Sequence, residues 1–160
     1  MDFENISTLP EYGYCSPVSL ADLIDADCQQ VPDRGGVYVV VREPSTPPQF
    51  LIESPAGHFD DRNPTVAETE LLRNWVDQVV ILYVGETDNL RRRFKQFIRF
   101  GHGQPVGHWG GRYLWQLEDS ANLCLSWKLT PDENPVDLKR RLLKTFRVRY
   151  SKLPFANLKN

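Results

Sequence analysis

Three short hydrophobic segments along the chain predict β-strands. Residues 37–41 and 79–84 are almost entirely apolar and rich in β-branched side chains, as in strands that are buried on both faces. In residues 123–129, leucines and a tryptophan alternate with Cys, Ser and Lys, which is the period of a half-buried strand. We therefore expect three main strands at these positions and a further short strand over 50–54.

Helical periodicity follows the second and third of these strands. From Leu90, apolar residues recur at i, i+4, i+7 and i+8 until Gly101 ends the pattern. Asn134 and Pro135 form an N-cap and first-turn pair, and Ser19 has the position of a cap for an earlier helix. The expected helices lie near 20–27, 66–77, 88–100 and 135–150.

The order of these elements predicts an α/β (α+β) fold with a small, mainly antiparallel three-stranded sheet flanked by helices. A chain of 160 residues suits one such domain, and 41% hydrophobic with 25% charged residues excludes wholesale disorder. Residues 1–30 are expected to form an N-terminal extension and residues 31–160 the main domain. Proline, serine and glycine are frequent after the first strand, so we interpret residues 42–78 as an inserted segment.

The chain is expected to be cytoplasmic and to have no membrane partner. No stretch approaches the roughly 18 apolar residues that a membrane helix needs, and the acidic start is unlike a targeting peptide. The 3 cysteines form no CxxC pair, so they are expected to be reduced.

Charge is distributed unevenly between the two halves of the chain. Residues 1–80 contain 4 basic and 14 acidic side chains, whereas residues 81–160 contain 15 basic and 7 acidic ones. A basic surface attracts phosphates regardless of the net charge, which is -2 here, so the second half favours an anionic partner such as nucleic acid. Solvated helix faces that are basic by chance are the alternative explanation.

Two tripeptides on the predicted strands carry a family resemblance. Residues 36–38 read Gly-Val-Tyr and residues 83–85 read Tyr-Val-Gly, and residues 86–93 continue as Glu-Thr-Asp-Asn-Leu-Arg-Arg-Arg. This pattern resembles the GIY-YIG nuclease superfamily from Gly36 to about Asn157. Residues 108–112 (His-Trp-Gly-Gly-Arg) and 153–157 (Leu-Pro-Phe-Ala-Asn) look like a lesser-known branch of it.

The resemblance implies a phosphodiesterase site and assigns a role to three residues. Tyr38 would be the base or the group that positions water, Tyr83 its hydrogen-bonding companion, and Arg93 the clamp on the phosphate. Such chemistry needs a base and a cation facing the phosphate oxygens, and usually a metal. The family implies Mg²⁺ as cofactor and nucleic acid as partner, with DNA favoured over RNA.

The family's metal-binding glutamate has no counterpart at the matching position, because Lys139 stands there. Lys139 shares one helical face with Leu142, Leu143 and Phe146, so we expect it to point toward the protein. Asp137 points elsewhere on the same helix. Glu86 and Glu133 stay open as alternative acids, and Mg²⁺ binding is therefore doubtful in this chain.

Other side chains are candidates for contacting nucleic acid rather than for holding a metal. His102 and His108 lack the spacing of a zinc site, so no metal ligand is assigned. His108 and Arg112, in a glycine-rich loop, are candidate phosphate contacts. The expected basic face consists of Arg92, Lys95, Arg99, Arg140, Arg141 and Lys144.

These observations predict a GIY-YIG-type endonuclease domain that acts on nucleic acid phosphodiesters. The main alternative is a catalytically silent nucleic-acid-binding module on the same fold. A protein-interaction module that uses the acidic first half is a second alternative.

Overall fold

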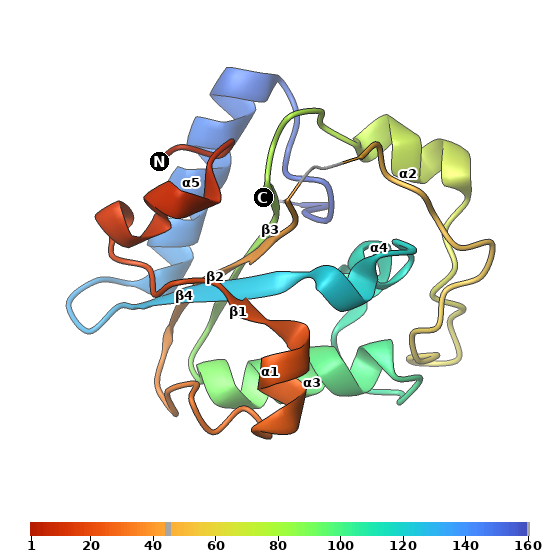
Figure 1. Cartoon of the computed structure of the whole chain (residues 1–160), viewed down its shortest axis with the longest axis horizontal. Coiled ribbons are helices and arrows are strands. Elements are labelled where there is room, and N and C mark those ends of the chain that lie inside the picture. Colours follow the sequence, from red (N-terminus) through yellow and green to blue (C-terminus); the bar gives the residue numbers. More distant parts are fainter. Residues whose placement is uncertain (44–45, 160) are drawn as a thin grey trace.

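One antiparallel sheet of four strands organises the molecule (Figure 1). The computed structural model describes residues 1–43 and 46–159. The strands follow the order β1-β4-β2-β3 across the sheet, and each pairs with its neighbours in antiparallel fashion. They are β1 (Val18–Ser19), β2 (Gly36–Val41), β3 (Ile81–Thr87) and β4 (Cys124–Leu129).

The three main predicted strands are present, and the expectation of a three-stranded sheet is corrected to four. The additional strand, β1, comes from the first 30 residues and pairs with β4 at the edge of the sheet. The second predicted strand is β3, and it begins later than expected, at Ile81. It continues to Thr87 because its last residues pair with Gly36 and Val37 of β2. The strand expected over 50–54 is reduced to an isolated bridge between Phe50 and Leu117.

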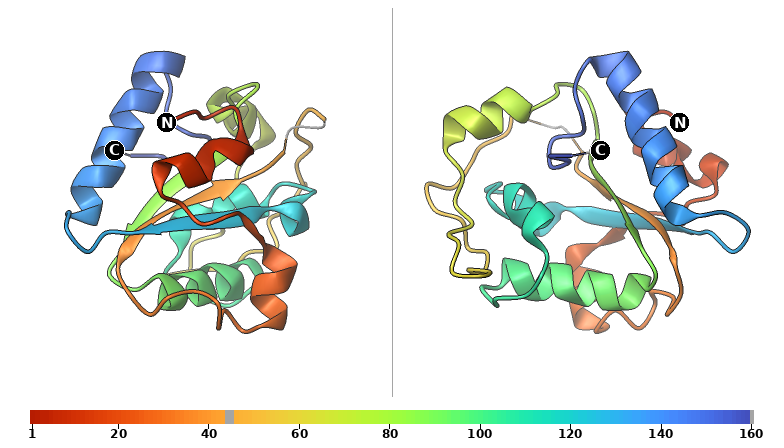
Figure 2. Two further views of the ribbon diagram at one scale, coloured as in Figure 1. Left: turned by 60° about the vertical axis from the view of Figure 1, so that its left-hand side comes forward. Right: turned by 180° about the vertical axis from the view of Figure 1, so that it is seen from behind.

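The two long helices cover opposite faces of the sheet (Figures 1 and 2). They are α3 (Leu90–Gly101) and α5 (Pro135–Tyr150), capped by Asn89 and Asn134. α5 begins at the expected residue, whereas α3 begins at Leu90 and not at 88 because Asn89 is its cap. Alternate residues of β2 point to opposite faces, so Tyr38 belongs to the core on the α3 side and Val37 to the core on the α5 side.

Shorter helices complete the structure. Ser19 caps its helix as expected, accepting a hydrogen bond from the backbone of Asp22. Phe3 and Leu9 of the N-terminal segment are buried in the core beside α5. The remaining helices are η1 (Ile6–Tyr12), α1 (Leu20–Asp25), α2 (Glu68–Asn74), η2 (Trp109–Gly111), α4 (Arg112–Trp115) and η3 (Ser120–Asn122). Among the described residues no helix is long and apolar enough to cross a membrane.

The segment 46–78 is held against the end of α4 by a buried glutamine. Gln116 accepts a hydrogen bond from the backbone N–H of Val66 and donates to the carbonyl oxygens of Val66 and Leu51, at 2.8 to 3.0 Å. One side chain thus satisfies backbone groups from two distant parts of this segment. Just before this segment, the buried Arg42 forms a 2.7 Å ion pair with Asp119.

The C-terminal segment covers the free edge of β3. Asn157 donates from its amide to the Val84 carbonyl at 2.9 Å and accepts from the Val84 N–H at 2.8 Å. The N–H of Ala156 donates to the Leu82 carbonyl. These contacts satisfy backbone groups that an edge strand would otherwise leave open, next to the strand that carries Tyr83.

Candidate functional site

The two motif tyrosines lie on one face of the sheet. Tyr38 pairs with Gly85, and Tyr83 pairs with Val40, so the register places both phenol side chains on the α3 side. Their ring centroids are 5.9 Å apart. Tyr38 is 1% exposed and Tyr83 9%, so both rings belong to the core.

Gly85 allows the Tyr38 ring to lie across β3. A Cβ atom added at Gly85 would lie 2.5 Å from Cε1 and from the hydroxyl oxygen of Tyr38, and closer still to Cζ. No other residue type fits there without moving the ring or the strand. Glycine is therefore required at position 85, the end of the second tripeptide, because the ring of Tyr38 from the first tripeptide fills the space that a side chain would need.

Arg93 extends from α3 toward the tyrosines and the glycine-rich loop. Its Nη1 donates to the Gly107 carbonyl at 2.9 Å and to Gln96 Oε1 at 3.3 Å. Burial and Tyr83 raise the pKa of Tyr38 well above its usual value, while Arg93 opposes the rise. Burial opposes protonation of Arg93, but the two phenols outweigh it, and the pKa of Arg93 is raised. At neutral pH Arg93 is charged and Tyr38 is a neutral phenol.

His108 is buried behind Tyr38 rather than exposed on a loop. Its Nε2 lies 3.5 Å from the Tyr38 hydroxyl oxygen, and its ring packs 5.0 Å from that of Phe97. Nδ1 has no hydrogen-bond partner among the described residues. Burial, and secondarily Arg93, lower the pKa of His108 to about 3. Because its side chain is 1% exposed, His108 does not present a surface contact for phosphate.

An open pocket of about 590 Å³ lies in front of Arg93. It is bounded by the end of β3, the first turns of α3 and the start of α5. Its lining combines arginines with acidic and amide side chains, so it is polar and suited to a charged ligand. The lining residues are Glu86, Thr87, Asp88, Arg92, Arg93, Gln96, Pro135 and Val136.

Lys139 points toward the protein, as its helical face predicts, and contacts Glu86. Its Nζ lies 3.4 Å from Glu86 Oε1, and the two side chains are 20% and 30% exposed. Glu86 pairs with Val37 in the sheet, so this ion pair belongs to the α5 face and Tyr38 to the other. The pair reaches the pocket through Glu86, but the sheet separates it from the tyrosines.

The acids of the pocket do not fit a Mg²⁺ site. Magnesium requires oxygen ligands, of which at least one is normally a carboxylate. Glu86 is paired with Lys139, and Asp88 accepts a 2.6 Å hydrogen bond from Arg92. Glu133, the other candidate acid, does not line the pocket and pairs with Arg141 at 2.5 Å. In residues 1–43 and 46–159, no three His, Cys, Asp or Glu side chains gather as a metal site.

The six candidates for a basic face are divided between α3 and α5, on opposite faces of the sheet. Four of them have acidic partners, and Arg99 donates to the Gln104 side chain at 2.7 Å. A single continuous basic face is therefore not what the structure presents. The ion pairs are Arg92–Asp88, Lys95–Asp27, Arg140–Asp137 and Arg141–Glu133.

One side chain of the site, and one contact of a neighbouring arginine, were not identified from the sequence. Gln96 lies one helical turn after Arg93 and bonds to it, a contact that the i, i+3 spacing could have suggested. Arg91 donates to the carbonyls of Val31 and Gln29, so its role is to anchor the loop before β2. No pattern along the chain indicates that contact.

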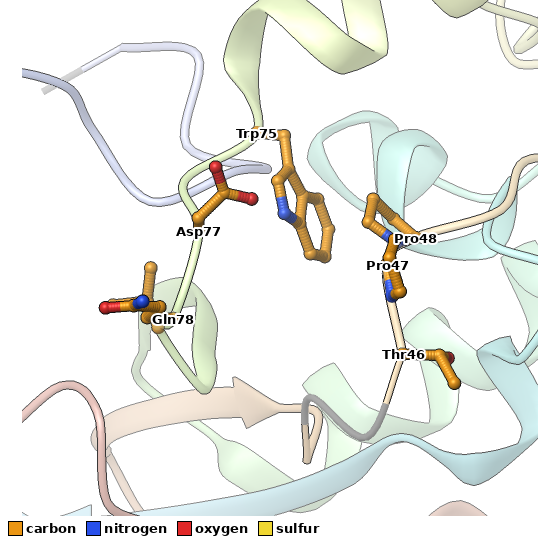
Figure 3. Close-up of a pocket in the computed structure, with 7 residues that line it drawn as sticks. Thr46, Pro47, Pro48, Trp75, Asp77 and Gln78 are labelled. Atoms are coloured by element: carbon orange, nitrogen blue, oxygen red, sulfur yellow. The ribbon is translucent and has the colours of Figure 1, made fainter.

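A separate pocket of about 370 Å³ lies at the base of the inserted segment (Figure 3). The ring of Trp75 faces Pro47 and Pro48 across it, and Asp77 lies at one side. Its lining includes none of the motif residues. This pocket is therefore distinct from the site at Arg93.

No protein-family model matches this chain, and neither a curated protein nor a solved structure matches it. The functional argument therefore depends on the residues of the site.

Proposed function

We propose that this chain is a GIY-YIG-type endonuclease domain that acts on nucleic acid phosphodiesters. The supporting observation is the gathering of Tyr38, Tyr83 and Arg93, from three elements, on one face of the sheet behind an open polar pocket. A planar guanidinium that is held in place at a polar pocket can donate two parallel hydrogen bonds to two oxygens of a phosphate.

Each group of the site would have a distinct role in the hydrolysis of a phosphodiester. Arg93 reaches the pocket and would hold the phosphate, and its charge would stabilise the negative charge that builds up during hydrolysis. Tyr38 stays protonated at neutral pH, so it would position Arg93 or a water molecule rather than act as a phenolate base. With its proton on Nδ1, His108 could accept a hydrogen bond from Tyr38 at Nε2.

Substituting Arg93 is expected to weaken nucleic acid binding far more than substituting its neighbour Arg92. Arg92 is an exposed residue of the same pocket, with 58% of its side chain accessible, and it already pairs with Asp88. We expect about a 30-fold loss of oligonucleotide affinity for Arg93→Ala and about a 3-fold loss for Arg92→Ala. Fluorescence anisotropy over a series of salt concentrations measures both.

Arg92→Ala is the matched control because it removes the same charge from the same pocket. Equal losses from both substitutions would reject Arg93 as the phosphate clamp. Affinity that does not change with salt would reject nucleic acid as the partner and would favour the protein-interaction module.

One observation favours a second candidate, a nucleic-acid-binding module that does not cleave. The pocket carboxylate Glu86 is neutralised by Lys139, and Asp88 by Arg92. An ammonium can pair with a phosphate, but it cannot supply a metal-bound hydroxide. Cleavage by the unaltered chain in Mg²⁺ is therefore expected to be weak or undetectable.

Lys139→Glu is expected to create divalent-cation binding next to the pocket. The substitution places two carboxylates together where an ion pair now lies, and their repulsion favours a shared Mg²⁺. We expect a Kd in the millimolar range or tighter by calorimetry, with Mg²⁺ raising Tm by a few degrees. Lys144→Glu is the control, since it makes the same charge change at an exposed position of α5.

Cleavage assays of the same variants separate the two candidate functions. Mg²⁺-stimulated cleavage by the Lys139→Glu protein that disappears when Arg93→Ala is added supports the nuclease. Metal binding without cleavage supports the silent module, whose tyrosine face is separated from the metal by the sheet. Equal Mg²⁺ binding by the Lys144→Glu protein would contradict the special position of Lys139.

A further inference from the structure

Two arginines from distant segments lie against one tryptophan ring. The guanidinium carbon of Arg62 is 4.5 Å from the ring centroid of Trp109, and that of Arg112 is 4.8 Å from it. Arg62 belongs to the inserted segment and Arg112 to the start of α4. We call Arg62, Trp109 and Arg112 the Trp109 cluster.

A tight turn in the inserted segment places Arg62. Asp60 and Asp61 have φ values of 51° and 57°, and the N–H of Arg62 donates to the Phe59 carbonyl at 3.1 Å. Two consecutive left-handed residues form the turn of a tight hairpin, and aspartate tolerates this conformation better than most residues. The Phe59 ring occupies the space beside Gly107, 3.6 Å from where a Cβ atom would be, so the tip of the turn lies next to the glycine-rich loop.

The Trp109 ring thus contacts two guanidiniums, and the charge of Arg62 is near enough to act on Arg112. The acidic partner of Arg62 is Asp60, at 3.6 Å with both side chains more than half exposed, which makes a weak pair. Arg112 donates to the Trp109 carbonyl at 3.1 Å, which fixes its direction. Burial lowers the pKa of Arg112, and the charge of Arg62 lowers it further. Tyr113 and Glu70 act in the opposite direction. Two guanidiniums held together in this way favour an anion.

The Trp109 cluster lies beside the site at Arg93. Gly107, two residues before Trp109, accepts the hydrogen bond from Arg93. Gly110, the residue after it, is in contact range of the Tyr83 hydroxyl, at 3.5 Å from an added Cβ. The loop that carries Trp109 therefore contacts Arg93 directly and lies beside Tyr83.

We propose that Arg62 and Arg112 form a second phosphate-binding site, supported by the Trp109 ring. It binds a backbone phosphate close to the one held by Arg93, so that the inserted segment helps to fix the position of the strand. The assignment of the phosphate to a nucleic acid rests on the proposed function, whereas the anion site itself does not.

The experiment follows the indole resonance of Trp109, assigned by Trp109→Phe, in ¹H–¹⁵N spectra. The protein is titrated with inorganic phosphate at constant ionic strength and, separately, with a single-stranded DNA of about 12 nucleotides. Both ligands are expected to shift this resonance. Arg62→Ala should lower DNA affinity about tenfold and reduce the salt slope by about 0.7, the value for one phosphate contact on a single strand.

Arg73→Ala is the matched control. Arg73 is an exposed arginine of the same inserted segment, and in the structure its guanidinium is not one of those stacked on Trp109. It should change affinity less than twofold. A Trp109 resonance unmoved by both ligands, or an equal loss from Arg73→Ala, overturns the proposal.

The two proposals fail in different ways. If Arg93→Ala weakens DNA binding and Arg62→Ala does not, the second phosphate site is wrong and the proposed function stands. If DNA does not bind but inorganic phosphate shifts Trp109 in the unaltered protein and not in Arg62→Ala, the anion site stands and the proposed function is wrong. Arg112→Ala is a second test of the cluster, with the same expected loss as Arg62→Ala.

Discussion

Replacing Gly85 with alanine is expected to lower the free energy of unfolding by about 3 kcal/mol or more. The added methyl group would overlap the ring of Tyr38, which is packed on its other sides by Tyr83 and Phe94. Neither partner can move easily, since Gly85 is paired with Tyr38 in the β2–β3 ladder and the C-terminal segment covers the other edge of β3. Urea denaturation followed by far-UV circular dichroism measures the loss.

Gly110→Ala is the control for this substitution. Gly110 also lies at the site, but an added Cβ there has ordinary contact distances to the Tyr83 side chain, of 3.5 to 3.9 Å. Its cost should stay below about 1 kcal/mol. In a Tyr38→Ala background the obstacle is gone, so Gly85→Ala should cost much less. An equal cost in both backgrounds would show that Gly85 acts through its backbone conformation rather than through Tyr38.

The main elements could be predicted because their patterns are local. The apolar segment of β2, the alternation in β4 and the capped periodicity of α3 each depend on near neighbours in the chain. β1 could not be predicted in this way, since a strand of two residues has no period. It forms because Val18 and Ser19 pair with β4, and the sequence indicates only the helix cap at Ser19.

The sequence indicated that Tyr38, Tyr83 and Arg93 lie close together, but it placed Lys139 with them and could not show the orientation of these side chains. The side of the sheet on which a side chain lies depends on register, so the adjacent residues Gly85 and Glu86 serve opposite faces. The helical face of Lys139 shows that it points inward, but the sequence does not show which sheet face the helix covers. For this reason Lys139 is near Glu86 and not near Tyr38.

The charge imbalance between the halves is partly offset by folding. Lys95 pairs with Asp27 at 2.7 Å and Arg149 with Glu4 at 2.8 Å, so acids of the first half neutralise bases of the second. Composition cannot show this, because the partners lie far apart in the chain.

His108 is expected to make the protein strongly sensitive to mild acid. Its pKa is about 3 in the folded protein, whereas 6.5 is the ordinary value for histidine and applies to the unfolded chain. Below pH 6.5 the unfolded state therefore binds a proton that the folded state does not. The stability that neutral His108 provides is fully present above pH 6.5 and is lost as the pH falls toward 3.

The slope of this loss is about 1.4 kcal/mol per pH unit, and over the whole window it amounts to a few kcal/mol. The physical cause is burial beside Tyr38 and Phe97, together with the positive charge of Arg93. Protonation would place a second cation in that core without an acidic partner. The folded protein is thus expected to lose stability through His108 as the pH decreases.

Urea denaturation at several pH values between 3.5 and 7.5, a range chosen to span the two pKa values, measures the effect. For each protein, the free energy of unfolding is plotted against pH. The difference in slope between the unaltered protein and His108→Gln is the contribution of His108, because the titration of carboxylates contributes equally to both slopes. His58→Gln is the control, since His58 is exposed in the inserted segment. Identical slopes for the unaltered protein and His108→Gln would mean that His108 can take up a proton in the folded state, either by reaching solvent or by finding an acceptor for Nδ1. The packing between Tyr38 and the glycine-rich loop would then be looser than the 3.5 Å contact indicates.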